Sequence, residues 1–412
     1  MIKTDACIVG AGPGGVATAL KLSYLGIPSV LIDKATFPRD KVCGDAISGK
    51  VSTLLNRLDP HILERFNQRP IQAGVWGIKF VAPNRKELDI PFRPGSSRNA
   101  EMAPGYVARR YDFDNFLVEE VRRRDNIRFF EGVAVDGYTR SERGWAISAA
   151  GGELEVDTRM LIVADGAHSA FSRKVAGLEK DLRHHAGAVR AYFSGVGGLD
   201  GQPFIELHFI RSVTPGYFWI FPLPEGHANV GLGMRSDILS RRKLNLRKTL
   251  LEVVEEHPVL RERFKNARLI GEVKGYGLPL GSKQRPISGS HYMLVGDAGH
   301  LVDPLTGEGI GNAFYSGFIA AEQLQQCLLA NDFSASFLKA YDRRVSRVLG
   351  SEMRLSYRLQ KMLAYPWLVN WLANIIAGNQ RIVAVLSGMY NDFELREQLV
   401  KPWFWLKMFL KR

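Results

Sequence analysis

The sequence predicts an α/β fold in which a parallel-sheet domain, built from separate segments, carries an inserted antiparallel β-sheet domain and a helical C-terminal region. Three observations lead to this prediction. The chain opens with two short apolar strands joined by a helix, which is the βαβ unit of a parallel sheet. Short alternating strands interrupt the α/β pattern over 75–91 and 187–233. After Gly309 little strand character remains, and long helical patterns follow.

The elements follow in order along the chain. Apolar runs at Ala6–Val9 and Val30–Ile32 flank a helical pattern over Val16–Leu25. Asp112–Arg124 has acidic residues early and basic residues late, which indicates a helix. Ile127–Val163 holds four or five short strands.

Further along, the pattern predicts one basic helix at Ser240–Glu256 and a buried strand at His291–Val295. From these elements we expect three structural units. The parallel-sheet domain takes 1–74, 105–180 and 275–330, the inserted sheet domain 75–104 and 181–274, and the helical region 331–412.

The composition is that of an ordinary globular protein, with 46% hydrophobic and 24% charged residues. The 55 Lys and Arg against 42 Asp and Glu give a net charge of +13, which favours an anionic cofactor, a membrane surface or nucleic acid as partner. Three cysteines exclude a disulfide framework and a four-cysteine metal site, and we expect no metal. With no signal-peptide pattern and no clean transmembrane stretch, we expect a cytoplasmic protein.

A glycine-rich turn follows the first strand and fits G-x-G-x-x-G; its six residues are Gly10, Ala11, Gly12, Pro13, Gly14 and Gly15. The first glycine allows the turn, the second lets the backbone approach a pyrophosphate, and the third lets the helix pack on the strand. The helix N-terminus then offers free N–H groups to the phosphates. Asp33, followed by Lys34, ends the next strand, where a carboxylate would accept hydrogen bonds from ribose. The unit predicts Rossmann-type dinucleotide binding.

Four further segments resemble the flavin monooxygenase-like superfamily, in the same order along the chain. Val163–Ser169 resembles its central Asp-Gly segment, and Leu294–Ala298 its Gly-Asp segment. Arg110 opens an R-x-x-x-D-x-x-L helix entry, and Pro304–Gly311 resembles the loop that faces the flavin ring. The resemblance implies FAD as cofactor, with contacts from Arg110, Asp165, Gly166, Gly296, Asp297, Pro304, Gly307, Gly309, Ile310 and Gly311.

Two segments narrow the resemblance to the geranylgeranyl reductase family. Phe37–Asp45 resembles its F-P-R-x-K-x-C-G segment, with Asp45 where several members have glycine. Tyr217–Pro222, followed by Gly231–Gly233, resembles its Y-x-W-x-F-P…G-x-G signature. The resemblance implies an oxidoreductase that uses reduced FAD to saturate carbon–carbon double bonds in isoprenoid chains of lipids, quinones or pigments. It adds Arg39, Cys43, Gly44 and Asp45 to the expected cofactor contacts.

The aromatic strand supplies three catalytic-site candidates, Tyr217, Trp219 and Phe221. An isoprenoid chain has no polar group along its length, so a groove must hold it by apolar and aromatic area. Strand alternation places the three rings on one face, with Phe218 and Ile220 on the other. Either all five side chains are core, or the Tyr217 face walls a substrate tunnel over the flavin.

Cys43, with Gly44, is the other catalytic-site candidate and has two interpretations. It is a small buried residue in a turn, or it lies beside the flavin. In the second case Arg39 and Lys41 would favour the thiolate, which could tune the flavin or relay a proton. The other two cysteines are expected in the core.

Three alternatives remain open: an FAD-dependent monooxygenase (hydroxylase), a flavin-dependent halogenase, and a non-catalytic flavin-binding membrane sensor. Halogenases carry W-x-W-x-I-P, from which this chain departs at Tyr217 and Phe221. Because no second G-x-G-x-x-G is present, NAD(P)H would visit only transiently, or a protein reductant would supply the electrons. No recognition motif for nucleic acid is present, and we expect none to bind.

The charge excess concentrates near the C-terminus, where residues 341–412 carry 12 Lys and Arg against 5 Asp and Glu. Aromatic residues flanked by basic ones, over Tyr365–Leu372 and 401–412, are typical of interfacial segments. They predict contact with an anionic membrane surface and hence a peripheral membrane location. The alternative is a helical cap packed on the protein, and the sequence leaves the oligomeric state open.

Overall fold

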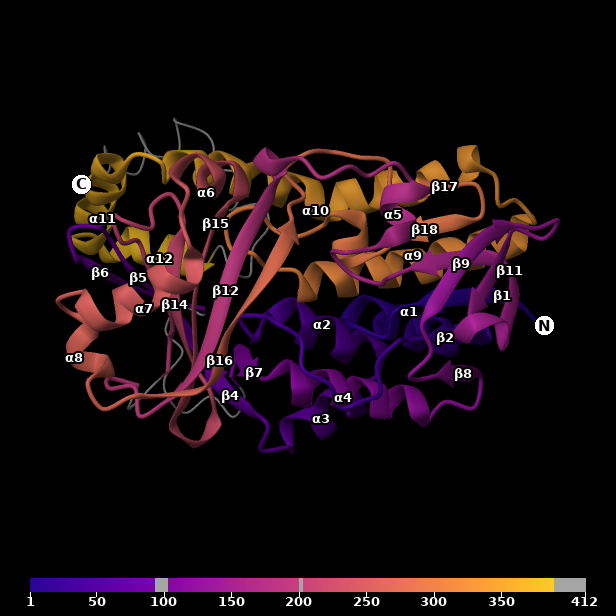
Figure 1. The fold of residues 1–412 in the computed structure, drawn as a ribbon, viewed down its shortest axis with the longest axis horizontal. Coiled ribbons are helices and arrows are strands. Elements are labelled where there is room, and N and C mark those ends of the chain that lie inside the picture. The colour runs from indigo at the N-terminus through magenta and orange to yellow at the C-terminus, as the bar shows by residue number, and fades with distance from the viewer. Residues whose placement is uncertain (93–102, 200–202, 389–412) are drawn as a thin grey trace.

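The computed structural model describes residues 1–92, 103–199 and 203–388. In these ranges the chain forms two large sheets that lie side by side, with a small third sheet near their junction (Figure 1). One large sheet has a parallel core, the other is mainly antiparallel, and the last helices follow both. The predicted fold class is therefore confirmed.

The first sheet is built on β1, which pairs in parallel with β2 on one side and β11 on the other. Its strand order is β17-β18-β11-β1-β2-β8, with β9 and β10 added as an antiparallel extension of β11. The bounds are β1 Ile2–Val9, β2 Ser29–Ile32, β8 Ile127–Phe130, β9 Val135–Arg140, β10 Trp145–Ala149, β11 Leu154–Val163, β17 Ser288–Gly289 and β18 Tyr292–Leu294. Because helices cover this sheet, its central strands are continuous apolar runs rather than alternating ones.

The second sheet has the order β16-β12-β15-β14-β13-β5-β6, and all its pairs are antiparallel except β13 with β5. Its bounds are β5 Gly77–Val81, β6 Glu87–Pro91, β12 His185–Ser194, β13 Ile205–His208, β14 Tyr217–Pro222, β15 His227–Arg235 and β16 Arg268–Pro279. One face packs on α6 (Ser236–Arg242), α7 (Leu246–Glu256) and α8 (Leu260–Phe264). The other face turns toward the first sheet, so the two sheets enclose the space described below (Figure 1).

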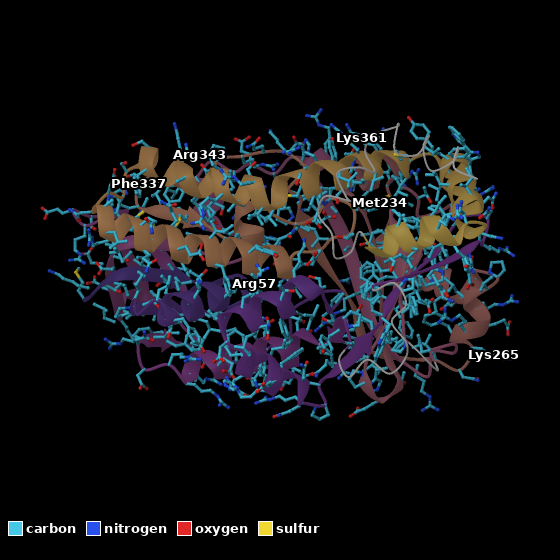
Figure 2. All side chains as sticks on the ribbon, turned by 180° about the vertical axis from the view of Figure 1, so that it is seen from behind. Arg57, Met234, Lys265, Phe337, Arg343 and Lys361 are labelled. Atoms are coloured by element: carbon cyan, nitrogen blue, oxygen red, sulfur yellow. The ribbon has the colours of Figure 1, made fainter. Side chains whose placement is uncertain are left out.

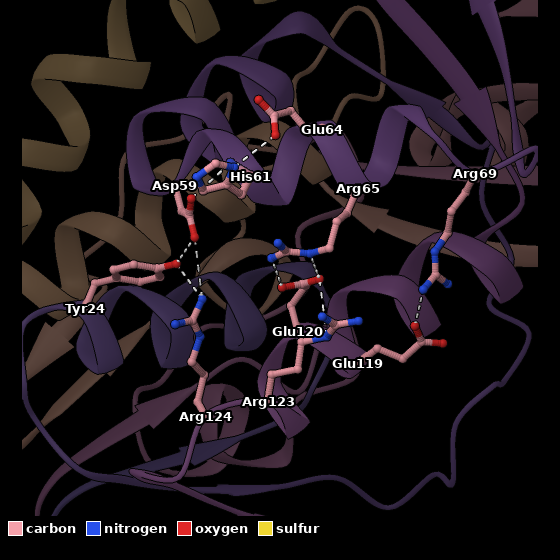
Figure 3. A network of polar contacts seen from close by, with 10 residues as sticks. All are labelled: Tyr24, Asp59, His61, Glu64, Arg65, Arg69, Glu119, Glu120, Arg123 and Arg124. Carbon is pink, nitrogen blue, oxygen red and sulfur yellow. Dashed lines mark hydrogen bonds and ion pairs between the residues drawn. The ribbon is translucent and has the colours of Figure 1, made fainter.

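The small sheet consists of β3 (Ala46–Ile47), β7 (Gly105–Ala108) and β4 (Gln72–Val75). It continues into α4 (Arg110–Arg122), against which α2 (Gly49–Leu58) and α3 (Pro60–Asn67) lie. Charged contacts fasten α3 to α4: Arg65 donates two hydrogen bonds, of 2.8 and 2.6 Å, to the buried Glu120, and Arg69 pairs with Glu119 (Figure 3). These contacts fix α4, whose first turn enters the site.

A long helix connects the two halves. After α1 (Pro13–Tyr24), α5 (Ala170–Lys174) and α9 (Ile310–Ala330), helix α10 (Ala335–Met362) runs for 28 residues, or about 42 Å. Phe337, Arg343 and Lys361 are spaced along it in Figure 2. Near its start Tyr341 donates to the Leu294 oxygen of β18 (2.7 Å). Past its end, Leu363 packs on the apolar cluster of the second sheet.

Two expectations about helices need correction. The single basic helix expected at 240–256 is wrong: Lys243 adopts a left-handed conformation (φ 51°) that ends α6, and the Asn245 side chain then caps α7 by accepting from Arg247 and Lys248 N–H. The helix expected from Asp112 begins two residues earlier, at Arg110. The aromatic segment 401–412 lies outside the described residues. The last described helices are α11 (Pro366–Ala377) and α12 (Gln380–Gly388).

Candidate FAD and substrate site

One cavity of about 540 Å³ lies between the two large sheets. Its lining runs from the glycine turn after β1, past the loop before α9, to the aromatic strand β14. The glycine turn and the aromatic strand are therefore parts of one site, although they are about 200 residues apart.

The glycine turn at one end of the cavity depends on its missing side chains. Gly10 has φ +103°, and a Cβ there would lie 2.4 Å from the Ala164 oxygen. A Cβ on Gly15 would lie 1.7 Å from the Gly10 oxygen, so this glycine is required by helix–strand packing and does not line the cavity. Gly12 differs, because a Cβ there would meet nothing closer than Arg39 Nη2, at 3.9 Å. The space beside Gly12 is open cavity, which is where a pyrophosphate would approach the backbone.

Two helix N-termini open onto the cavity. Pro13 and Gly14 begin α1, and Ile310, preceded by Gly309, begins α9; all four residues line the cavity. Neither helix has a side-chain cap or an acidic residue in its first turn. The free N–H groups and the positive ends of both helix dipoles are therefore available to anionic or electron-rich groups of a cofactor.

Three acidic residues expected at the cofactor also line the cavity, namely Asp33, Asp165 and Asp297. Asp33 accepts hydrogen bonds from the backbone N–H of Ala11 (2.6 Å) and Ala35 (2.8 Å), which fixes its carboxylate beside the glycine turn. Burial raises the pKa of Asp165 to about 6. The neighbouring candidates Lys34, Gly166 and Gly296 are in the lining as well.

The loop before α9 is held by a buried ion-pair cluster. Pro304, Gly307 and Gly309 line the cavity, whereas Gly311 does not: a Cβ there would lie 2.3 Å from Glu308 Oε1. Glu308 in turn pairs with Lys50 of α2 at 3.4 Å. The loop is therefore fixed by α2 as well as by its own helix.

A second cluster surrounds the Arg110 guanidinium. Arg110 donates two hydrogen bonds of 2.6 Å to Asp114, and Arg39 approaches the same carboxylate to 2.7 Å. Burial disfavours the charge of Arg110, but Asp114 and the Cys43 thiol outweigh this effect and raise the pKa of Arg110 above its usual value. Arg39, Arg110 and Cys43 all line the cavity, so two guanidinium groups and one thiol meet there.

Asp45 lies wholly buried next to Cys43 and Gly44, with φ +66°. Its carboxylate accepts hydrogen bonds from the Tyr192 hydroxyl (2.8 Å), the Asn229 side-chain amide (2.8 Å) and the Arg110 backbone N–H (3.3 Å). Burial outweighs these bonds and raises the pKa of Asp45 to about 6.

The aromatic strand forms one wall of the cavity. Tyr217, Trp219 and Phe221 line it, with successive ring centroids 6.1 and 6.0 Å apart. Phe218 and Ile220 point the other way, into the core beneath α7. The arrangement matches the alternation in the sequence, with one face in the core and one at the cavity. Beyond the rings the lining is apolar and includes Val75, Ile78, Ile205, Leu207 and Leu363.

Several cavity residues had no motif in the sequence to mark them. Asn229 connects Trp219 with the Cys43 loop, and Tyr192 reaches Asp45 from β12. Tyr276 lines the cavity with the Lys41 ammonium 4.5 Å from its ring centre. Only Tyr276, lying between two glycines, stands in a local pattern that hints at close packing.

The residues present fit FAD. The open space at Gly12, the two uncapped helix N-termini and the carboxylate of Asp33 at a strand end supply the groups that a dinucleotide requires. Among the described residues, no group of three or more His, Cys, Asp or Glu is placed to hold a metal ion.

Comparisons with known proteins agree with this geometry. The model of the FAD binding domain matches residues 3–201. A menaquinone reductase of Mycobacterium tuberculosis is 30% identical over 97% of this chain and 95% of its own length. A digeranylgeranylglycerophospholipid reductase of Thermoplasma volcanium is 30% identical over 83% of each chain.

Solved structures show the same architecture. A geranylgeranyl bacteriochlorophyll reductase-like protein from Thermoplasma acidophilum superposes with a TM-score of 0.79 and 25% identity, over 92% of each chain. The flavin-dependent halogenase CmlS has a TM-score of 0.70 at 21% identity, over 85% of this chain and 63% of its own, and shares the fold alone.

Fold, site and relatives together define an FAD-dependent oxidoreductase. Within that class the chain belongs to the geranylgeranyl reductase family. The resemblance predicted from the two sequence segments is thus confirmed, and so is FAD as the cofactor.

Proposed function

We propose that this enzyme reduces carbon–carbon double bonds in the isoprenoid chain of a quinone or lipid. The observation that carries the proposal is the single cavity that joins the dinucleotide end to an apolar, aromatic-walled end. A long hydrocarbon chain can be bound there only by contact area, which the aromatic rings supply. Relatives named for menaquinone and for digeranylgeranylglycerophospholipid support a substrate of this class.

In this proposal the residues divide the work as the sequence predicted. Bound FAD, once reduced, supplies the hydride. The cofactor is held by the glycine turn 10–15, by the acidic residues named above, and by the loop before α9. Tyr217, Trp219 and Phe221 orient the substrate chain and exclude water, while Gly44 leaves room for both ligands. Cys43, beside the Arg110 guanidinium, holds the proton that the second carbon receives.

The test is anaerobic incubation of the holoenzyme with dithionite and either menaquinone or a digeranylgeranylglyceryl lipid. We expect products heavier by about two mass units per bond, because each bond gains a hydride and a proton. Cys43→Ser and Trp219→Ala should keep FAD and lose most of this turnover. A reaction that requires oxygen would instead identify a hydroxylase or halogenase, and FAD binding without turnover of any substrate would favour a sensor.

The electron donor is proposed to be NAD(P)H, bound transiently, or a protein reductant. The same anaerobic holoenzyme distinguishes the two. Bleaching of the flavin absorbance by NADH or NADPH alone would identify a nicotinamide donor. A flavin that only dithionite reduces would identify a protein donor.

We further propose that α11 contacts an anionic membrane at the cytoplasmic face. Trp367 and Trp371 are 68% and 52% exposed, one turn apart on the same side of the helix, and Tyr365 is exposed beside them. The sequence has no acidic residue from 353 to 391, and Leu363, shortly before α11, lines the cavity. Aromatic rings with only basic neighbours suit a headgroup interface. Within the described residues, no helix combines the length and apolarity needed to cross a bilayer.

Flotation with anionic vesicles tests the membrane proposal. Replacing Trp367 and Trp371 by Ser should release the protein from phosphatidylglycerol vesicles and leave its FAD content unchanged. Leu329→Ser is the matched control, because Leu329 is 76% exposed on α9, away from this helix. Equal flotation of all three proteins would contradict the role given to α11.

A further inference from the structure

Asn229 occupies a central position between the cofactor loop and the substrate wall. It is wholly buried on β15, paired across the sheet with Tyr192 of β12 and Phe221 of β14. Its Oδ1 accepts the indole N–H of Trp219 (2.9 Å). Its Nδ2 donates to the Cys43 backbone oxygen and to Asp45 Oδ2, both at 2.8 Å.

These bonds leave the amide only one orientation. A carboxamide offers two N–H donors and one oxygen acceptor, and both donors and the oxygen are used here. Rotating the amide by half a turn would set N–H against the Trp219 N–H and oxygen against two other oxygens. Because the group is buried, such unpaired contacts would each cost a large part of a hydrogen bond. Asn229 is therefore rigid.

The groups joined by Asn229 are otherwise held together only by packing. A Cβ on Gly44 would lie 3.1 Å from Phe221 Cε2 and 3.8 Å from Trp219 Nε1, so the cofactor loop lies directly against the aromatic wall. Van der Waals contact of this kind sets a closest approach but allows sliding along the surface. The hydrogen bonds of Asn229 remove this freedom, because they fix the indole direction and the Cys43 peptide at once.

Asp45 completes the unit from the loop side. Its carboxylate receives the Asn229 amide together with the Tyr192 hydroxyl and the Arg110 N–H. The loop is thereby tied to β12, to β15 and to the first turn of α4 through one side chain.

We propose that Asn229 and Asp45 are positioning residues that set the Trp219 indole relative to the Cys43 loop, and so set the distance between the bound chain and the cofactor. The proposal rests on the proposed reductase function for its kinetic consequence. Its geometric part is independent of the substrate, because it concerns only the loop, the indole and the two polar side chains.

Asn229→Leu is the first test, since leucine has a similar volume and makes none of the three bonds. We expect a folded holoenzyme with normal FAD absorbance whose kcat for isoprenoid reduction falls roughly 10- to 100-fold, with a smaller change in KM. Wild-type kcat in this variant would overturn the proposal. So would a loss of activity no larger than the loss of FAD content, because Asn229 would then serve only folding.

A second readout needs no substrate. Cys43 is half-buried whereas Cys7 and Cys327 are buried, so peptide mass spectrometry can follow alkylation of Cys43 alone. The Asn229→Leu holoenzyme should react several-fold faster than wild type because the loop is released. An unchanged rate would overturn the geometric part. If the wild-type enzyme reduced no isoprenoid, the proposed function would fail, and this measurement would still decide the positioning role.

Exchange of the two polar groups gives the sharpest test. Asn229→Asp places two carboxylates in contact, and they can be accommodated only by sharing a proton, so its kcat should rise as the pH falls. The groups that face this position are Asp45 and Cys43 on the loop, Tyr192 and Arg190 on β12, and Arg110 on α4. The double variant Asn229→Asp/Asp45→Asn restores a donor–acceptor pair and should recover activity at neutral pH. A pH profile unchanged from wild type, or no recovery in the double variant, would overturn the proposal.

Discussion

Gly231 offers a direct test of how the aromatic wall is built. It lies on β15 opposite Trp219, two residues from Asn229 and on the same face. A Cβ at this position would lie 2.2 Å from Trp219 Cζ2 and 2.3 Å from the Val189 backbone oxygen. The glycine therefore provides the floor on which the indole rests, and Gly231→Ala removes that space.

The displacement can be worked out from these distances. Carbon atoms in contact lie about 3.5–4.0 Å apart, so a ring atom 2.2 Å from the new methyl group must retreat by about 1.5 Å, into the cavity. Overpacking of this kind costs about 1–3 kcal/mol of stability. A misplacement of about 1 Å at a reacting site can cost about 100-fold in rate. We expect the rate to suffer more than the fold, because Trp219 can move into open cavity.

Gly233→Ala is the matched control on the same strand. A Cβ there would lie 3.4 Å from Ala188 Cβ and 3.8 Å from Trp219 Cζ3, which are ordinary contacts. The assay is dithionite-driven isoprenoid reduction followed by mass spectrometry, with urea midpoints and flavin absorbance measured on the same samples. Gly231→Ala should lose turnover, and Gly233→Ala should keep it. Equal turnover in the two variants would refute this account of the wall.

Three other outcomes are expected. Gly12→Ala should fold normally yet lose FAD affinity in absorbance titrations, because the added methyl group meets only cavity space, 3.9 Å from Arg39 Nη2. The raised pKa of Asp45, about 6 against 3.8, means that the folded chain keeps a proton which the unfolded chain releases; its contribution to stability therefore falls as the pH rises from about 4 to 6, and Asp45→Asn should flatten that slope in urea midpoints. Glu120→Ala should cost about 2–3 kcal/mol in urea unfolding, because it leaves Arg65 without its buried partner, whereas the exposed Glu64→Ala should cost less than about 0.5 kcal/mol.

The parts of the fold that could be predicted are those with local causes. The opening βαβ unit is marked by a short apolar strand, a glycine turn and an amphipathic helix, all within the first 32 residues. The break at Lys243 escaped prediction because a left-handed lysine has no sequence marker, and the Asn245 cap lay inside an apparently continuous helical pattern. Propensity over such a window is a weaker influence than one capped turn.

The site divides in the same way. Trp219 and Phe221 could be assigned to one face because strand alternation is fixed by geometry. Asn229 could not be identified, since its importance comes from Cys43 and Asp45, which are more than 180 residues distant in sequence. An isolated asparagine in an apolar strand has no periodic or motif signal. Only the register of β14 with β15 brings it under the indole.

Asp45 shows how a departure from the family pattern can be accommodated. Its φ of +66° is one that glycine adopts freely and that aspartate tolerates better than most residues, so replacing glycine by aspartate leaves the turn intact. The added carboxylate would be costly if it were buried alone. Here Tyr192 and Asn229 both donate to it, so the substitution converts a turn into an anchoring point for the loop. Because Asn229 also holds Trp219, a change at position 45 reaches the substrate wall through one side chain, and residues 45 and 229 act as a pair rather than as separate contacts.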